Sequence, residues 1–301
     1  MRLTTGRKIA KVFAMKKKAS KKASKKAKRA LIVLSVLLLL AAALCAVYFF
    51  CFGRFVLVSD PAFSYLLPNS TLLRLRLALA SAGKRLVVVN VTSTDLSSAS
   101  SFTPILLSLS AKEILLSPVA SECAVAYDLN VSSLLADSIV YGMWSQSCSL
   151  FDATIISDVN AGWTEVGHAL ATMSQNVGVV YDSLGTSAYQ AIENSFSGNG
   201  LIAYPYDGES GLYYSNTLSD MDEKQVVLAV CPHLETFYNF FSFDSSVSWI
   251  VDYRYSKMVP KKQLYGIVVP DLAGLGSKLV EQPAQKGSQT VYTLDYKYET
   301  R

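Results

Sequence analysis

The sequence has few of the residues on which metal and nucleophile chemistry usually depend. Only two of its 301 residues are histidines, His168 and His233, and this excludes a multi-histidine metal site. It contains no Walker-type phosphate loop and no Gly-x-Ser-x-Gly nucleophile elbow. These absences remove the common nucleotide-dependent and serine-hydrolase classes. They predict a protein that is not an enzyme and that needs no metal or cofactor.

Cysteines are also few and irregularly spaced. Cys45 and Cys51 lie in an apolar stretch, where we expect them to act as small hydrophobic side chains. Cys123, Cys148 and Cys231 show neither a C-x-x-C motif nor a zinc-type Cys/His spacing. A disulfide between Cys123 and Cys148 would suit an oxidising compartment, but it would leave one thiol over. The sequence therefore favours free, partly buried thiols.

Cys231 and His233 are the one pair that suggests catalysis, as a thiol nucleophile and its base. They are two residues apart at a predicted strand-to-helix turn, which does not bring their side chains together. No Asn or Asp is placed to orient the imidazole. A Cys/His enzyme is therefore the weakest of our three functional hypotheses.

Charge is absent from residues 30–52, and acidic residues are absent from residues 1–29. The first 29 residues carry 13 of the 28 Lys and Arg, so this tail is +13. The remainder has 15 bases against 23 acids, or −8, which gives the overall +5. A 23-residue helix would extend about 34 Å, enough to cross the hydrocarbon of a bilayer. We therefore expect a single membrane span between a basic tail and a mildly acidic domain.

The tail repeats a Lys-Lys-Ala-Ser pattern and has no apolar face, so we expect it to be disordered in solution. Such a run should stay cytoplasmic and lie against anionic headgroups, at about 1 kcal/mol per base. Nucleic-acid binding is disfavoured, because no aromatic residue is interleaved with the lysines. The span predicts a signal-anchor in the inner (cell) membrane. A lipoprotein processed at Cys45 is the alternative, and both place the domain on the extracytoplasmic, periplasmic side.

After residue 53 the apolar runs become short and alternate with helical patterns. Strands are expected at 55–59, 85–91, 113–119, 138–142 and 153–159, with helices at 70–82 (capped by Ser70 and ended by Gly83), 102–111 and 131–136. The alternation at 73–77 also fits a strand. A helix at 161–175 precedes strands at 177–181, 201–204, 225–230, 246–251 and 264–269, separated by helices at 187–196, 212–222, 234–241 and 272–281. Continuous apolar strands that alternate with helices are typical of parallel sheets covered on both faces.

The pattern predicts five segments: a tail (1–29), a transmembrane helix (30–52), a first α/β lobe (53–160), a second α/β lobe (161–288) and a C-terminal strand or tail (289–301). Residues 289–298 alternate in polarity and suggest an edge strand.

From about residue 54 to 285 the sequence resembles the type I periplasmic binding protein superfamily, whose ligand-binding fold is also used by regulators of the lac repressor type. The resemblance rests on four segments: residues 55–61, the strand–Asp158–glycine–helix sequence from 153 to 170, the strand 177–181 with the following 182–185, and the turn at 266–271. It implies two Rossmann-like lobes with a cleft between them. The domain is shorter than many members and its return crossings are hard to place, which would fit a degenerate member.

In open parallel sheets, ligands bind beyond the carboxyl ends of the strands, where the strand order reverses. Aromatic faces there can stack on a ring, while Asp and Arg can hydrogen-bond hydroxyl or amide groups. An Asp after a strand can instead simply cap the next helix, and Trp144 can belong to the core or its rim. The predicted ligand-binding residues are Asp60, Phe63, Ser93, Trp144, Asp158, Asp182, Ser183, Asp207, His233, Asp252 and Arg254.

These observations predict a membrane-anchored, extracytoplasmic solute-binding or sensory protein that closes two lobes over a small polar ligand such as a sugar or nucleoside. We expect it to hand the solute to a transporter or to report it to a sensor subunit. The alternative is a membrane-anchored interaction or scaffold protein that keeps the fold and has lost the ligand.

Overall fold

The computed structural model describes residues 33–49, 51–171, 176–198, 200–206, 226–230 and 247–301. The chain divides into two compact units, residues 1–52 and 53–301. The described part of the first unit is mainly a helix over residues 33–49, whose leucine and valine side chains are exposed. Among the described residues, no helix has both the length and the apolar composition that a membrane crossing requires.

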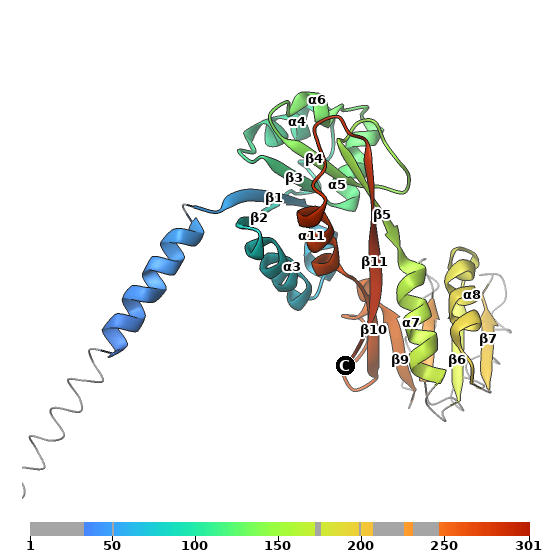
Figure 1. Cartoon of the computed structure of the whole chain (residues 1–301). Coiled ribbons are helices and arrows are strands. Elements are labelled where there is room, and N and C mark those ends of the chain that lie inside the picture. Colours follow the sequence, from blue (N-terminus) through green and yellow to red (C-terminus); the bar gives the residue numbers. More distant parts are fainter. Residues whose placement is uncertain (1–32, 50, 172–175, 199, 207–225, 231–246) are drawn as a thin grey trace, which may run out of the picture. The chain divides into compact units, whose positions relative to one another are not determined.

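The second unit is an α/β fold built on an eleven-stranded, mostly parallel sheet, in agreement with the sequence (Figure 1). The first half of the sheet has the order β2-β1-β3-β4-β5, with every neighbouring pair parallel. Its strands are β1 (Gly53–Ser59), β2 (Lys84–Asn90), β3 (Glu113–Leu116), β4 (Ile139–Met143) and β5 (Ala153–Asp158).

The second half repeats this order as β7-β6-β8-β9-β10, again with parallel pairs. Its strands are β6 (Val177–Tyr181), β7 (Leu201–Pro205), β8 (Val226–Val230), β9 (Ser248–Asp252) and β10 (Leu264–Pro270). In each half the strand order reverses beside the half's own first strand, β1 or β6. This is where ligand sites form in such sheets.

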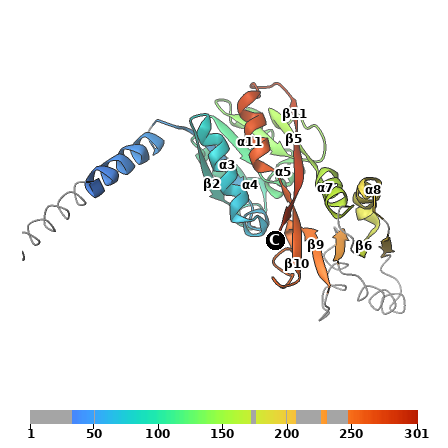
Figure 2. The same ribbon diagram turned by 60° about the horizontal axis from the view of Figure 1, so that its bottom comes forward.

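Strand β11 (Thr290–Thr300) joins the two halves. Residues 290–295 run parallel to β5, and residues 296–300 run antiparallel to β10 (Figures 1 and 2). The prediction of an edge strand was therefore wrong, because β11 has a hydrogen-bonded neighbour on both sides. Its alternation comes from one buried face, formed by Tyr292, Leu294 and Tyr296, and not from an exposed edge.

The helices cover the faces of the sheet. They are α2 (Pro61–Leu66), α3 (Asn69–Ser81), α4 (Ala99–Ser108), α5 (Pro118–Ala126), α6 (Val131–Leu134), α7 (Val159–Ala171), α8 (Thr186–Ser195) and α11 (Leu272–Glu281), with short 3₁₀ turns η1 (Ser183–Gly185) and η2 (Tyr253–Tyr255). Helix α7 packs against α8, and α11 packs against α3. The helices predicted at 212–222 and 234–241 lie outside the described residues.

Helix α11 carries the chain back to the first half, although the sequence-based division placed it in the second lobe. It lies beside α3 in both views (Figures 1 and 2). Gly276 makes this approach possible, since a Cβ there would lie 3.0 Å from Leu75 Cδ1 and 3.2 Å from Ala78 Cβ. The chain thus passes between the halves after β5, after β10 and within β11.

Two further details differ from the prediction. Helix α3 begins at Asn69 after Pro68, with no side-chain cap, so Ser70 does not cap it. Helix α5 begins at Pro118, inside the strand predicted at 113–119, and a short helix, α2, which the sequence did not predict, begins directly after Asp60. Gly83 ends the α3 segment as expected, with a φ of +68° that suits glycine.

Strand β1 shows why the strands have continuous apolar runs. Phe55 and Leu57 belong to one buried cluster, while Val56 and Val58 belong to another on the opposite face. All four are 0% exposed, so both faces of the strand are covered. Cys123 and Cys148 are half-buried, free thiols packed against the second cluster.

Candidate functional site

Two adjacent cavities lie at the carboxyl ends of strands from both halves of the sheet. We name them the α7 cavity, of about 420 Å³, and the α2 cavity, of about 350 Å³. Both are lined by Ser157, Val159, Asp252 and Arg254. The α7 cavity adds Asp158, Asn160, Trp163, Leu184, Gly185, Ser187, Ala188 and Val230, and the α2 cavity adds Asp60, Ala62, Phe63, Leu66, Pro118, Val119, Tyr253 and Tyr296.

The α2 cavity lies between the two halves. Asp60 and Phe63 follow β1, and Pro118 follows β3, in the first half. Tyr253 and Arg254 follow β9 in the second half. The parallel strands of each half all end on the same side, so their loops meet here, as the rule for open parallel sheets predicts.

Asp60 is buried and its carboxylate is held within the protein. Oδ1 accepts a hydrogen bond from the Phe63 amide at 2.9 Å and caps α2. Oδ2 accepts one from Ser117 Oγ at 2.7 Å, and the Asp60 amide donates to the same hydroxyl at 3.0 Å. Asp60 therefore fixes the start of α2 against the end of β3 and shapes the cavity wall.

Asp252 and Arg254 form an ion pair at the junction of the two cavities. Asp252 Oδ1 accepts hydrogen bonds from Arg254 Nε at 2.8 Å and from the Arg254 amide at 2.9 Å. Burial works to lower the pKa of Arg254, but the Asp252 charge and two neighbouring tyrosines raise it overall. The guanidinium thus stays charged and is held by one nitrogen, in a position that lines both cavities.

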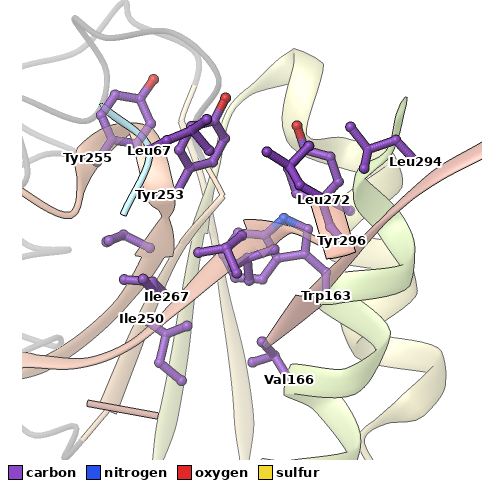
Figure 3. Packing of buried hydrophobic residues seen from close by; sticks show 14 of the residues in the cluster. Leu67, Trp163, Val166, Ile250, Tyr253, Tyr255, Ile267, Leu272, Leu294 and Tyr296 are labelled. Atoms are coloured by element: carbon purple, nitrogen blue, oxygen red, sulfur yellow. The ribbon is translucent and has the colours of Figure 1, made fainter. Parts of the chain in front are cut away.

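Tyr253 and Tyr296 form an aromatic wall in the α2 cavity, while Trp163 lines the α7 cavity. Figure 3 shows these three side chains. The two tyrosine rings are 6.2 Å apart, and their hydroxyls point to the same side. Burial, then the charge of Asp252, raises the pKa of Tyr296 to about 12. Burial also raises the pKa of Tyr253. Both phenols are therefore neutral donors at physiological pH.

Five of the predicted ligand-binding residues line the cavities: Asp60, Phe63, Asp158, Asp252 and Arg254. Four others do not line them: Ser93, Trp144, Asp182 and Ser183. Asp207 and His233 lie outside the described residues, as does Cys231. Contact with a ligand stays a prediction for every one of these residues.

The residues that do not line the cavities have other surroundings. Asp182 is buried and accepts a hydrogen bond from the Gly185 amide at 3.0 Å, which caps η1. Ser93 is exposed in the turn after β2, and Trp144 is half-buried against the cluster of the first half. The alternative interpretation, that such residues cap or pack, thus describes Asp182 and Trp144.

Sequence reasoning missed Trp163 and Tyr296, which are 2% and 9% exposed. Trp163 falls within the helix predicted at 161–175, and the sequence does not mark it as a cavity residue. Tyr296 lies on a strand whose place between β5 and β10 the sequence did not reveal. The polarity alternation of residues 289–298 did mark the buried face of β11, and it could have identified Tyr296 as inward-facing.

The described lining of the two cavities combines a few polar side chains with apolar ones. Among the described residues, no group of three or more His, Cys, Asp or Glu could hold a metal ion. Such a lining can hydrogen-bond a polar solute and cover its apolar faces.

The two repeated sheet orders, the shared strand β11 and the interposed cavities define the fold as that of the type I periplasmic binding proteins. Among solved structures, the chain is similar to an ABC transporter system solute-binding protein from Conexibacter woesei. That match has 12% identity and a TM-score of 0.54, and it covers 82% of this chain and 88% of the other. A mutant XylFII–LytSN complex matches with 11% identity and a TM-score of 0.51, covering 82% and 97%. No protein-family model matches the chain, and neither does any curated protein.

Proposed function

We propose that the protein is a solute-binding module that closes two α/β lobes over a small polar ligand and does not catalyse a reaction. The observation that carries this proposal is the pair of cavities between the halves, which share Asp252 and Arg254. Cavities of about 420 and 350 Å³ fall in the range of small-molecule sites. Three passages of the chain between the halves would act as the hinge.

The chemistry of the lining indicates the class of ligand. Arg254 offers a charged donor, Asp158 is exposed at the rim, and Tyr253 and Tyr296 contribute neutral hydroxyls. The aromatic wall can cover one face of a ring. A neutral, hydroxyl-rich or amide-bearing solute, such as a sugar or a nucleoside, meets both requirements.

We also propose that the module is anchored in the inner membrane, with its basic tail cytoplasmic and the domain outside. Support comes from the 23 uncharged residues at 30–52 and the 13 cations before them. The similarity to an ABC transporter system solute-binding protein supports a transporter as partner. A sensor subunit is the other partner that this placement allows.

Thermal unfolding of the full chain in nanodiscs, against a panel of sugars, nucleosides and amino acids, tests the proposal. A ligand present at 100 times its Kd should stabilise the domain by about 2.7 kcal/mol, a shift of several degrees. Arg254→Ala should weaken that ligand about tenfold or more, since a hydrogen bond to a charged group is lost. The matched control is Arg76→Ala, an exposed arginine on α3 that lines neither cavity.

The alternative of an interaction or scaffold protein also has an observation in its favour. The cavity-lining carboxylates of Asp60, Asp158 and Asp252 all accept hydrogen bonds from the protein itself. A cleft whose carboxylates are already bonded can exist without a ligand. No stabilisation by any member of the panel, together with retention on the membrane, would favour this second function over the first.

A further inference from the structure

A third cavity, the basic groove, adjoins the α2 cavity and shares Leu66 with it. Its volume is about 540 Å³, the largest of the three described here. It is lined by Leu66, Pro68, Ser256, Lys257, Val259, Lys261, Leu264 and Arg301. The proposed solute-binding function makes no use of it.

The charge of the groove is opposite to that of the chain around it. Lys257 and Lys261 contribute two cations, Arg301 adds a guanidinium, and none of the described lining side chains is acidic. Residues 30–301 as a whole carry 15 bases against 23 acids. The two lysines in a concave site raise the local concentration of anions.

The rest of the lining is apolar. Val259 is 4% exposed, and Leu66, Pro68 and Leu264 are half-buried. A small inorganic anion would satisfy the cations but leave this apolar surface in contact with water. We infer that the groove binds an amphipathic organic anion, in which a phosphate or carboxylate is joined to a hydrocarbon body. The headgroup end of an anionic lipid and a free anionic amphiphile share this chemistry.

The occupant would touch both halves of the domain. Leu66 and Pro68 belong to the α2–α3 turn of the first half, while Lys257 and Lys261 precede β10 in the second. Lys257 already connects the halves, because its Nζ donates to the Tyr65 carbonyl and lies 3.6 Å from the centroid of the Tyr65 ring. A bound anion therefore stabilises the arrangement of the halves in which the groove forms, and it is linked to opening and closing of the cleft.

Calorimetric titration of the full chain in nanodiscs with octyl phosphate, below its micelle concentration, tests the inference. Octyl phosphate should bind the groove, and inorganic phosphate and octyl glucoside should each bind at least about tenfold more weakly, since each lacks one half of the chemistry. Hydrogen exchange should slow in both 61–68 and 256–264 when octyl phosphate is bound. Equal binding of inorganic phosphate, or protection of one segment only, would overturn the inference.

Variants of the groove residues distinguish binding in the groove from binding to the basic tail, because every variant keeps the tail. Lys257→Gln with Lys261→Gln should weaken the groove's share of octyl phosphate binding by at least about tenfold and abolish the exchange protection. Lys261→Gln alone leaves the contact between Lys257 and Tyr65 intact and should weaken octyl phosphate binding in the groove about threefold or more. This single variant replaces the double variant if the double variant folds poorly. Lys112→Gln, at an exposed lysine outside the groove, should change nothing. Unchanged protection in the double variant would refute the site.

Competition identifies the source of the anion. Displacement of octyl phosphate by dihexanoyl phosphatidylglycerol, and not by dihexanoyl phosphatidylcholine, would support a lipid headgroup as occupant. Displacement by neither would support a free amphiphile. Equal displacement by both lipids would show that negative charge is not required, and would overturn the inference. None of these outcomes depends on a solute in the cleft, so failure of the proposed function would be seen separately.

Discussion

The Asp152 carboxylate accepts four hydrogen bonds, so the effect of removing its charge on the stability of the fold can be calculated. Its side chain is 0% exposed. Oδ1 accepts hydrogen bonds from Ser132 Oγ at 2.5 Å and from the Gly287 amide at 2.7 Å. Oδ2 accepts from the Val140 amide at 2.8 Å and from Lys286 Nζ at 3.2 Å. The carboxylate thus ties β4 and α6 to the segment that leads from α11 into β11.

Substitution of Asp152 by Asn keeps the volume and removes the charge. Each carboxylate oxygen faces two donors, and of these only the Ser132 hydroxyl can turn to accept a hydrogen bond from an amide NH₂. Whichever position becomes NH₂ therefore leaves the backbone N–H of Gly287 or of Val140 without its acceptor. Loss of one partner from a fully buried ion pair costs about 3–5 kcal/mol, but the Lys286 side chain is 38% exposed and keeps contact with water. We expect Asp152→Asn to lower the free energy of unfolding by about 1–3 kcal/mol, the cost of leaving a buried donor unsatisfied.

Denaturant unfolding of the full chain, followed by tryptophan fluorescence, measures the change, since all three tryptophans lie within residues 53–301. Asp137→Asn, at an exposed aspartate nearby in the sequence, is the matched control and should cost less than about 0.5 kcal/mol. A loss below about 1 kcal/mol for Asp152→Asn, or one no larger than that of the control, would refute the reasoning.

The same variant has a signature in pH. Burial acts to raise the pKa of Asp152, but the donors from Ser132, Gly287, Val140 and Lys286 outweigh it and lower the pKa below its usual value. A carboxyl group with a lowered pKa in the folded state stabilises the fold above its unfolded pKa, near 4, and loses this contribution as pH falls further. The difference between wild type and Asp152→Asn should therefore be constant from pH 7 to 5 and shrink below about pH 4.

Three further predictions concern single positions. Gly142→Ala should lower the free energy of unfolding, measured by thermal unfolding, by about 1–3 kcal/mol, because the new Cβ would lie 2.3 Å from the Phe151 ring. Unchanged stability would mean that the ring can move aside. The pKa of Tyr296 is raised to about 12, so the free energy of unfolding should fall as the pH rises from 10 towards 12. Tyr296→Phe should make this dependence on pH less steep. An unchanged dependence in the variant would count against burial of the Tyr296 hydroxyl. Ser117→Ala should lower the free energy of unfolding by about 1–2 kcal/mol, because Asp60 Oδ2 loses the hydroxyl that donates to it at 2.7 Å. A loss of helix signal from α2 in circular dichroism would accompany this change. Unchanged stability would show that water replaces the hydroxyl.

Much of the sheet could be predicted because its signal is local. The runs 177–181 and 226–230 are apolar on both faces, and the structure places strands at Val177–Tyr181 and Val226–Val230. A run of this kind, bounded by polar or turn residues, has few other ways to be buried. Helix α11 has the predicted bounds for a similar reason, since its apolar residues recur at helical spacing.

Long-range pairing could not be predicted in the same way. Alternation in residues 289–298 is a property of one strand, whereas its position depends on two partners far away in the sequence. The hydrogen-bonding edges of β5 and β10 have no sequence signature of their own. The edge-strand prediction failed for this reason, and the wall formed by Tyr296 was missed with it.

The rule for parallel strands selected Asp60 and Asp252, which line the cavities, because the carboxyl ends of parallel strands share one side of the sheet. The same rule selected Asp182, which lines neither cavity and caps η1. Asp60 lines a cavity and also caps α2, so a rule about position cannot tell which carboxylates are free to meet a ligand. Trp163 was missed because an apolar helical residue at a cavity wall looks the same in sequence as one in the core.

The place of β11 between β5 and β10 also determines the order in which the molecule can be completed during synthesis. Until residues 290–300 have left the ribosome, β5 and β10 each present an unsatisfied backbone edge, and such edges invite pairing with other chains. Neither half can be finished on its own ahead of the other. A nascent chain stopped short of residue 290 would therefore expose two adhesive strands at once, and β11 is the segment that protects both of them from pairing with other chains.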